Sequence, residues 1–163
     1  MPPLTERAFE ELYGHALRPL WAYVRRVIGN AADADEVVQE AFCRVLCADI
    51  SSLSLDEQRR YVLRVASHVV VDRWRRSKRE RLWLRHVEPE RAVAPEPPAD
   101  DLVKVFEMLK PRERALLWLA YVEQDSHEEI ATALGLRRSS VKVLLARARA
   151  RLRDLLTARQ TRT

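Results

Sequence analysis

The chain is divided by a proline-rich segment, residues 87–99, which holds four of its eight prolines. Proline lacks the backbone donor that helix interiors and central strands require, so this composition favours a semi-extended linker. The 163 residues are enough for one ordinary domain or two small ones. We therefore expect a first domain over residues 1–85, a linker over 86–100 and a second domain over 101–163.

On both sides of the linker, apolar residues recur at the three- and four-residue spacing of amphipathic helices, and no segment alternates as a strand does. This pattern predicts an all-α fold of two small helical domains. Only 3 glycines are present, which argues against Rossmann and P-loop sites, where glycine lets the backbone approach a phosphate. The predicted helices cover residues 9–28, 33–46, 56–79, 102–109, 111–120, 126–134 and 139–156.

Three details of these helices can be predicted from single residues. Pro19 interrupts the first apolar stripe and is expected to kink or split that helix. Asp33 is of the type that caps a helix N-terminus, so we expect it to cap the second helix. Trp74 falls on the apolar stripe of the third helix and is therefore expected in the core, with a role as a stacking surface as the alternative.

Positive charge is concentrated in two blocks. Residues 58–85 hold 10 basic and 2 acidic side chains, and residues 137–163 hold 9 basic and 1 acidic, whereas residues 1–57 hold 5 basic and 10 acidic. Arginines make up 25 of the 29 cations, and their planar guanidinium groups match phosphates and guanine edges. One such block could be a solvated helix face, but two blocks favour nucleic-acid binding.

The last two predicted helices form a helix-turn-helix pattern. Ile130 and Leu134 point inward, Ala131 is small where two helices cross, and Gly135 supplies the left-handed turn. In this motif, residues at the start of the second helix meet base edges, and later cations meet phosphates. The pattern therefore predicts DNA binding, with an ordinary helical hairpin as the alternative.

The chain from Phe9 to Leu156 resembles the extracytoplasmic-function branch of bacterial RNA polymerase sigma factors. Four motifs, in the family's order, carry the resemblance. They are the acidic run from Asp33 to Phe42, the segment Tyr61 to Arg79 with Asp72-Arg73-Trp74-Arg75-Arg76, the entry Leu109 to Arg114, and the helix-turn-helix from Glu129 to Arg149.

The resemblance implies a factor that binds core RNA polymerase, directs promoter-specific transcription initiation and melts the −10 element. It implies core RNA polymerase and promoter DNA as partners, a cognate anti-sigma factor, no membrane insertion and a cytoplasmic location. The site residues that it implies are Asp35, Glu36, Gln39 and Glu40 for the polymerase; His68, Asp72, Arg73, Arg75, Arg76 and Arg79 for the −10 element; and Arg138, Ser139, Ser140, Lys142, Arg147 and Arg149 for the −35 element.

Three residues depart from the family pattern. Glu36 replaces the commoner aspartate, which preserves the charge but moves it by one methylene. His68 stands where the family usually has asparagine, and Arg137 stands where a serine commonly caps the recognition helix. Ser139 is an alternative cap, which would shift the start of that helix by two residues.

Two other classes of protein fit the sequence less well. A helix-turn-helix repressor or activator with an N-terminal dimerisation domain leaves the first basic block unexplained. A nucleic-acid enzyme would need a carboxylate cluster, a metal-ligand spacing or a nucleophile pair, and the sequence offers none. Cys43 and Cys47, four residues apart, are interpreted as small helix residues, although modification of these thiols could disturb polymerase binding. No cofactor or metal is expected.

Overall fold

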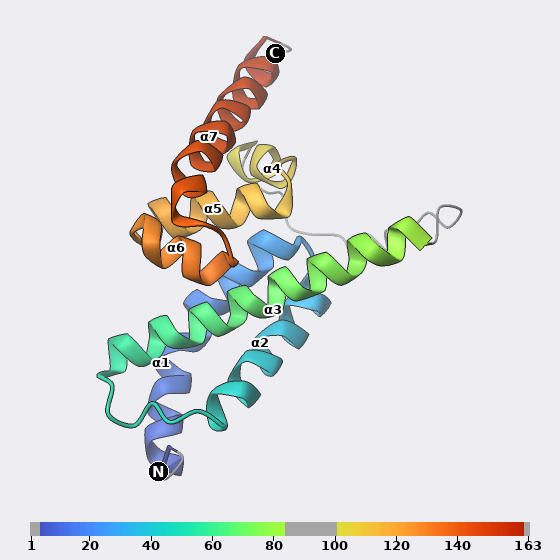
Figure 1. Cartoon of the computed structure of the whole chain (residues 1–163). Coiled ribbons are helices and arrows are strands. Elements are labelled where there is room, and N and C mark those ends of the chain that lie inside the picture. Colours follow the sequence, from blue (N-terminus) through green and yellow to red (C-terminus); the bar gives the residue numbers. More distant parts are fainter. Residues whose placement is uncertain (1–3, 84–100, 162–163) are drawn as a thin grey trace.

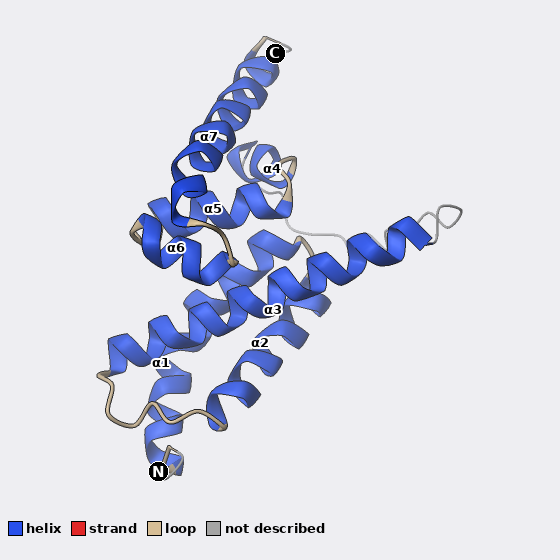
Figure 2. Cartoon of the chain, in the orientation of Figure 1, coloured by secondary structure: helices blue, strands red, loops and turns tan. Residues whose placement is uncertain are grey.

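The computed structural model describes residues 4–83 and 101–161, so the proline-rich segment and the proposed domain boundaries lie outside the described residues. The described part is helical, with no strand, which confirms the all-α prediction (Figure 2). The helices are α1 (Glu6–Ile28), α2 (Ala31–Leu46), α3 (Leu55–Trp83), α4 (Asp101–Glu107), α5 (Pro111–Tyr121), α6 (His127–Leu134) and α7 (Arg138–Gln160).

The first half, α1 to α3, is a bundle in which each helix packs on the other two (Figure 1). Helix α1 is continuous through Pro19, so the predicted split does not occur. The cap of α2 is Asn30 rather than Asp33, because the Asn30 side chain accepts a hydrogen bond from the Asp33 backbone N–H at 2.9 Å. Asp33 instead places its negative charge in the first helical turn, where the helix dipole favours it.

The long helix α3 extends beyond the bundle that α1 and α2 form with it (Figure 1). Trp74 lies in this extension. It is only partly buried and outside the core, with the Lys78 ammonium 5.5 Å from its ring centroid. The prediction that Trp74 is a core residue is therefore wrong, since the apolar stripe continues in sequence past Val70, the last residue of α3 that is buried among those described.

The second half, α4 to α7, contains the predicted helix-turn-helix. Ser126 caps α6 by accepting from the Glu129 backbone N–H, and Gly135 ends α6 in the left-handed conformation with φ of 63°. Helix α7 begins at Arg138 with Arg137 at the cap position, and the Arg137 side chain makes no capping hydrogen bond. The alternative start at Ser139 is therefore wrong, because Ser139 already lies in the first turn.

The two halves pack against each other. Helix α3 lies against α6, and α1 lies against α5 (Figure 1). The buried side chains of both halves form one hydrophobic cluster. Tyr23 of α1, fully buried, lies 6.2 Å from the ring of Trp118 of α5. The structure is thus a closed arrangement in which two helical units share a core.

Candidate functional site

The acidic side of α2 is engaged within the chain. Glu36 accepts from the Arg73 guanidinium of α3 at 3.0 Å, and Glu40 lies 3.9 Å from the same group. Glu40 also pairs with Arg44 at 2.6 Å. The structure thus brings together two of the predicted polymerase-binding residues and Arg73, a predicted DNA-binding residue. These pairs are partly exposed, and surface pairs of this kind contribute roughly 0–1 kcal/mol each, so a partner can displace them.

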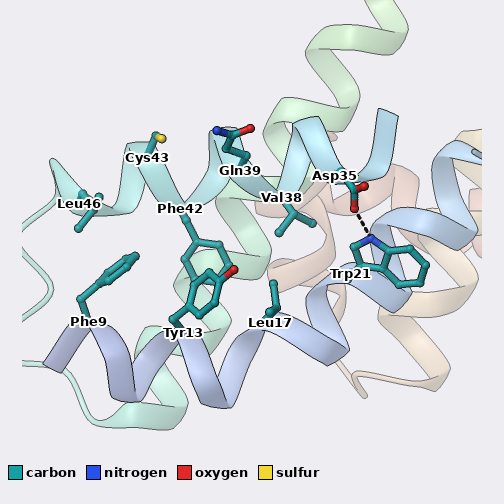
Figure 3. Close-up of a pocket in the computed structure, with 10 residues that line it drawn as sticks. All are labelled: Phe9, Tyr13, Leu17, Trp21, Asp35, Val38, Gln39, Phe42, Cys43 and Leu46. Atoms are coloured by element: carbon teal, nitrogen blue, oxygen red, sulfur yellow. Dashed lines mark hydrogen bonds between the residues drawn. The ribbon is translucent and has the colours of Figure 1, made fainter. Parts of the chain in front are cut away.

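Next to these acids, α1 and α2 form a groove of about 420 Å³ (Figure 3). Aromatic rings gather at one end, where the Tyr13 and Phe42 centroids are 4.9 Å apart. At the other end, Trp21 Nε1 donates to the Asp35 carboxylate at 2.7 Å. The residues lining the groove are Phe9, Tyr13, Leu17, Trp21, Asp35, Val38, Gln39, Phe42, Cys43 and Leu46.

Sequence reasoning missed the apolar part of this surface. Tyr13, Trp21 and Leu46 are 42, 37 and 41% exposed, which is high for side chains of their size. The signal that could have found Trp21 is its position off the apolar stripe of α1. Asp35 and Gln39 both line the groove, so two of the four predicted polymerase-binding residues belong to one concave surface with these side chains.

The cations of α3 face two directions. Arg73 points toward α2, where it pairs with Glu36. His68 and Arg75 face the second half instead. His68 Nε2 donates to the Thr132 backbone carbonyl at 2.8 Å. Arg75 lies near Gly135, where an added Cβ atom would be 3.6 Å from a guanidinium nitrogen of Arg75. The other predicted −10 residues are exposed along the same helix, namely Asp72, Arg76 and Arg79.

The predicted −35 residues lie on α7, which projects from the molecule (Figure 1). Its buried side is formed by Val141, Leu145 and Ala148. Ser139 and Arg147 lie eight residues apart on the opposite, exposed side, with Val143 midway between them. Val143 is 50% exposed, and sequence reasoning missed this apolar residue as well.

The remaining α7 residues lie beside this exposed ridge. Lys142 is exposed and Ser140 is partly buried. Arg138 lies 3.9 Å from Glu128 with 74% of its side chain exposed, so it is held weakly. Arg149 donates to the Tyr121 hydroxyl at 2.7 Å, which fixes its guanidinium beside α5.

Burial shifts the pKa of two groups near the contact between the halves. Burial raises the pKa of Asp125 to about 6, and the nearby Glu129 and Glu123 carboxylates add to this. Burial also raises the pKa of Tyr23, which stays neutral and donates to Ser67 Oγ at 2.9 Å, since Ser67 itself donates to the Leu63 carbonyl.

Within the described ranges, Cys43 and Cys47 are free and exposed, and no group of three or more metal-ligating side chains is present. No helix in the described part of the chain is both long and apolar enough to cross a membrane.

Comparison with known proteins decides the family. The model of sigma-70 region 2 matches residues 12–80, and that of sigma-70 region 4 matches residues 99–152. The chain is 33% identical to the RNA polymerase sigma-E factor of Streptomyces coelicolor, over 93% of this chain and 87% of that protein. It is 30% identical to the ECF RNA polymerase sigma factor SigL of Mycobacterium tuberculosis, over 80 and 78% of the two chains. The chain belongs to the extracytoplasmic-function sigma factors.

Solved structures agree on the fold of this sigma factor. The sigma factor RpoE of Bartonella quintana, solved with the anti-sigma factor NepR, superposes with a TM-score of 0.69 at 21% identity, covering 91% of this chain and 96% of that one. CnrH, solved with the cytosolic domain of CnrY, gives a TM-score of 0.62 at 27% identity, covering 94 and 90%.

The protein is therefore an alternative sigma factor, which binds core RNA polymerase and directs promoter-specific transcription initiation. The region 2 match extends over the first half, so the alternative of a repressor with an N-terminal dimerisation domain is not supported.

Proposed function

We propose that the first half binds core polymerase through the acidic side of α2 and the groove beside it. Asp35, Glu36, Gln39 and Glu40 would supply hydrogen-bond acceptors and negative charge for a basic partner surface. Tyr13 and Trp21 would supply the apolar contact, because exposed aromatic side chains next to charges are typical of interface centres. The observation that carries this assignment is the position of Asp35 and Gln39 on the wall of an open apolar groove.

We propose that α3 recognises and opens the −10 element. Arg73, Arg75, Arg76 and Arg79 would hold phosphates, and His68 would contact a base of the opened strand. Asp72 directly precedes Arg73 on the same helix and belongs to the same proposed site. Arginines along one helix suit a backbone that carries a negative charge at every nucleotide.

We propose that α7 reads the −35 element in the major groove. Arg138, Ser139, Ser140 and Lys142 lie at its start, where base edges are expected, and Arg147 and Arg149 lie two turns later. Val143 belongs with the reading residues, since an exposed apolar side chain on this face fits the methyl group of thymine.

The sigma factor would act in the cytoplasm and would supply binding and strand separation rather than a reaction of its own. One structural relative, RpoE, was solved with the anti-sigma factor NepR, and the other, CnrH, was solved with the cytosolic domain of CnrY. We propose a cognate anti-sigma factor for this chain as well.

The polymerase-binding assignment can be tested by charge reversal. The variant D35K/E36K/E40K should lose co-elution with core polymerase in gel filtration by about tenfold or more, because repulsion replaces attraction across the interface. A matched control reverses three exposed acids of the same half that lie away from the groove, in E11K/D49K/D56K. Equal co-elution of the two triple variants would contradict the assignment.

A further inference from the structure

One cation of α7 is held by a neutral side chain of α5. Arg149 Nη1 donates to the hydroxyl oxygen of Tyr121, the last residue of α5, at 2.7 Å. Two residues further along α7, Arg151 instead lies 3.6 Å from the Glu113 carboxylate, also on α5. A carboxylate offsets the positive charge of its partner, whereas a hydroxyl fixes a guanidinium group and leaves its charge uncompensated. Arg149 is therefore oriented by α5 and still carries its full positive charge.

Both members of this pair have hydrogen atoms left to donate. The bond uses one of the five N–H groups of Arg149, and within the described ranges neither Arg149 nor Tyr121 has another hydrogen bond or ion pair. Because the Tyr121 oxygen accepts from Arg149, its own hydroxyl hydrogen remains available. Tyr121 is 55% exposed and Arg149 is exposed as well. Two neighbouring surface donors, one of them charged, suit an oxyanion such as a phosphate.

Arg149 continues a stripe of cations that begins at the start of α7. At 3.6 residues per turn, Arg138, Lys142 and Arg149 lie within about 40° of one another around the helix axis. All three side chains are exposed. Arg149 follows Arg138 by about 16 Å along the axis at ~1.5 Å per residue. The major groove is only ~12 Å wide, so with the start of α7 in the groove Arg149 reaches the flanking phosphates.

The Tyr121 side chain has little to do in the core of the second half. Trp118, one turn earlier on α5, lies 6.2 Å from the Tyr23 ring, whereas more than half of Tyr121 is in contact with solvent. Exposed polar groups contribute little to the stability of a fold. The bond between Tyr121 and Arg149 therefore fits a role in binding better than a role in folding.

From this geometry we propose that Tyr121 and Arg149 form one phosphate-binding site, in which both side chains donate to the same backbone phosphate at the edge of the −35 element. The proposal rests on the proposed reading of the −35 element by α7. It extends the DNA-binding surface from α7 to the end of α5. Every nucleotide carries a phosphate, so this site reads no base and instead fixes the position of α7 on the duplex.

The test measures the Kd of holoenzyme for a duplex that the wild-type holoenzyme selects from a randomised pool. Each phosphate near the −35 element is replaced in turn by a neutral methylphosphonate. The phosphate bound by Arg149 is the one at which replacement weakens the wild type by about tenfold but R149A by about threefold or less. Y121F should lose most of the penalty at this same phosphate. Y121F with the full wild-type penalty there would overturn the proposal.

A matched control removes a different hydroxyl. Thr157 lies two turns after Arg149 on α7, and its hydroxyl donates to the Arg153 carbonyl within the helix. T157V keeps the shape of the side chain and should show the wild-type pattern at every phosphate. The same loss of the penalty in T157V and in Y121F would overturn the assignment to Tyr121. Melting followed by circular dichroism checks the fold, and R149Q replaces R149A if R149A is destabilised.

A double-variant cycle on the unmodified duplex tests whether the two side chains act together. We expect Y121F to weaken binding by about fivefold in the wild-type background and by less than about twofold in the R149A background, because one partner is already missing. Equal factors in the two backgrounds would mean that Tyr121 and Arg149 act independently, which overturns the shared site.

The outcomes distinguish this proposal from the function on which it rests. If R149A keeps the wild-type penalty at every phosphate, Arg149 does not hold the DNA backbone, and the proposed role of Arg149 and the shared site fail together. If R149A loses the penalty at one phosphate and Y121F does not, the shared site is wrong and the assignment of α7 to the −35 element is unaffected.

Discussion

The two basic blocks of the sequence, residues 58–85 and 137–163, carry equal excesses of positive charge, but the structure presents the helices that hold most of them, α3 and α7, differently. The cations of α3 face α2 through Arg73 and α6 through Arg75, and His68 is bonded to a backbone carbonyl. On α7, Ser139, Val143 and Arg147 are exposed. Equal charge therefore does not mean equal availability. The residues of α7 proposed to read the −35 element make few contacts within the chain, whereas two of the α3 residues proposed for the −10 element, His68 and Arg73, are hydrogen-bonded to other helices.

The largest expected effect separates strand opening from duplex binding. R73A/R75A/R76A/R79A should reduce open complexes of the holoenzyme by about tenfold or more, while duplex binding changes by less than about threefold. R147A/R149A should show the reverse, since these residues are proposed to hold the phosphates of the duplex. Permanganate reactivity of unpaired thymines measures opening, and filter binding measures the duplex. If both variants change strand opening and duplex binding alike, the two helices do not have the separate roles proposed for them.

The next effect concerns reading by α7. R138A should weaken binding to the correct promoter by about 1–3 kcal/mol and relax the preference at one position, as expected for an arginine on a guanine edge. R149A should weaken all sequences alike and reduce the salt slope by about one unit. A promoter library assayed at two salt concentrations checks both. Uniform loss in both variants would exclude Arg138 as a base reader.

A smaller effect is expected at the exposed Val143. V143S removes one methyl group of the side chain and replaces the other by a hydroxyl, so an apolar contact with thymine is lost. We expect a few-fold weaker preference at one thymine, or about 1 kcal/mol or less. V122S is the matched control, because the Val122 side chain is 58% exposed and lies outside α7. If the two variants have the same sequence preference as the parent, Val143 does not read DNA.

The smallest effect is a pH dependence from Asp125. Its pKa is raised to about 6 by burial and by Glu129 and Glu123, against the opposing charges of Arg60 and Arg59. A raised pKa in the folded state means that protonation stabilises this state. The contribution is fully present below the ordinary pKa of 3.8 and is lost as the pH rises through about 6.

Replacing Asp125 by asparagine, its neutral isostere, tests the direction of this pH dependence. D125N should raise the melting temperature relative to wild type at about pH 7, and the difference should shrink toward about pH 5. D49N, at an exposed acid of the first half, should show no such trend. If the difference in melting temperature between D125N and wild type grows as the pH falls, the raised pKa of Asp125 is not the cause.

The sequence predicted the helices well because their apolar spacing survives in the packed molecule. The details that failed depend on neighbours that spacing does not encode. Asn30 rather than Asp33 caps α2 because α2 begins before its apolar stripe, and Trp74 lies beyond Val70, the last residue of α3 that is buried among those described. Residues in the acidic and basic motifs could be named, but not their pairing.

The contacts between the halves were the least predictable part. His68 meets a backbone carbonyl, and any residue at position 132 has a carbonyl, so no side-chain signal marks this bond. Arg59 and Glu123 are two charges among many in a chain with 33% charged residues. The groove between α1 and α2 likewise needs two helices to be placed before Trp21 and Asp35 can meet.

The central claim is that this sigma factor gives core polymerase its promoter specificity, and reconstituted transcription tests it most directly. Purified protein is mixed with core RNA polymerase and fragmented DNA from the source of the sequence, and RNA 5′ ends are mapped. The account predicts discrete start sites that share two upstream elements, present with the wild-type protein and absent with core polymerase alone or with D35K/E36K/E40K. Start sites that are the same with and without the protein would contradict it.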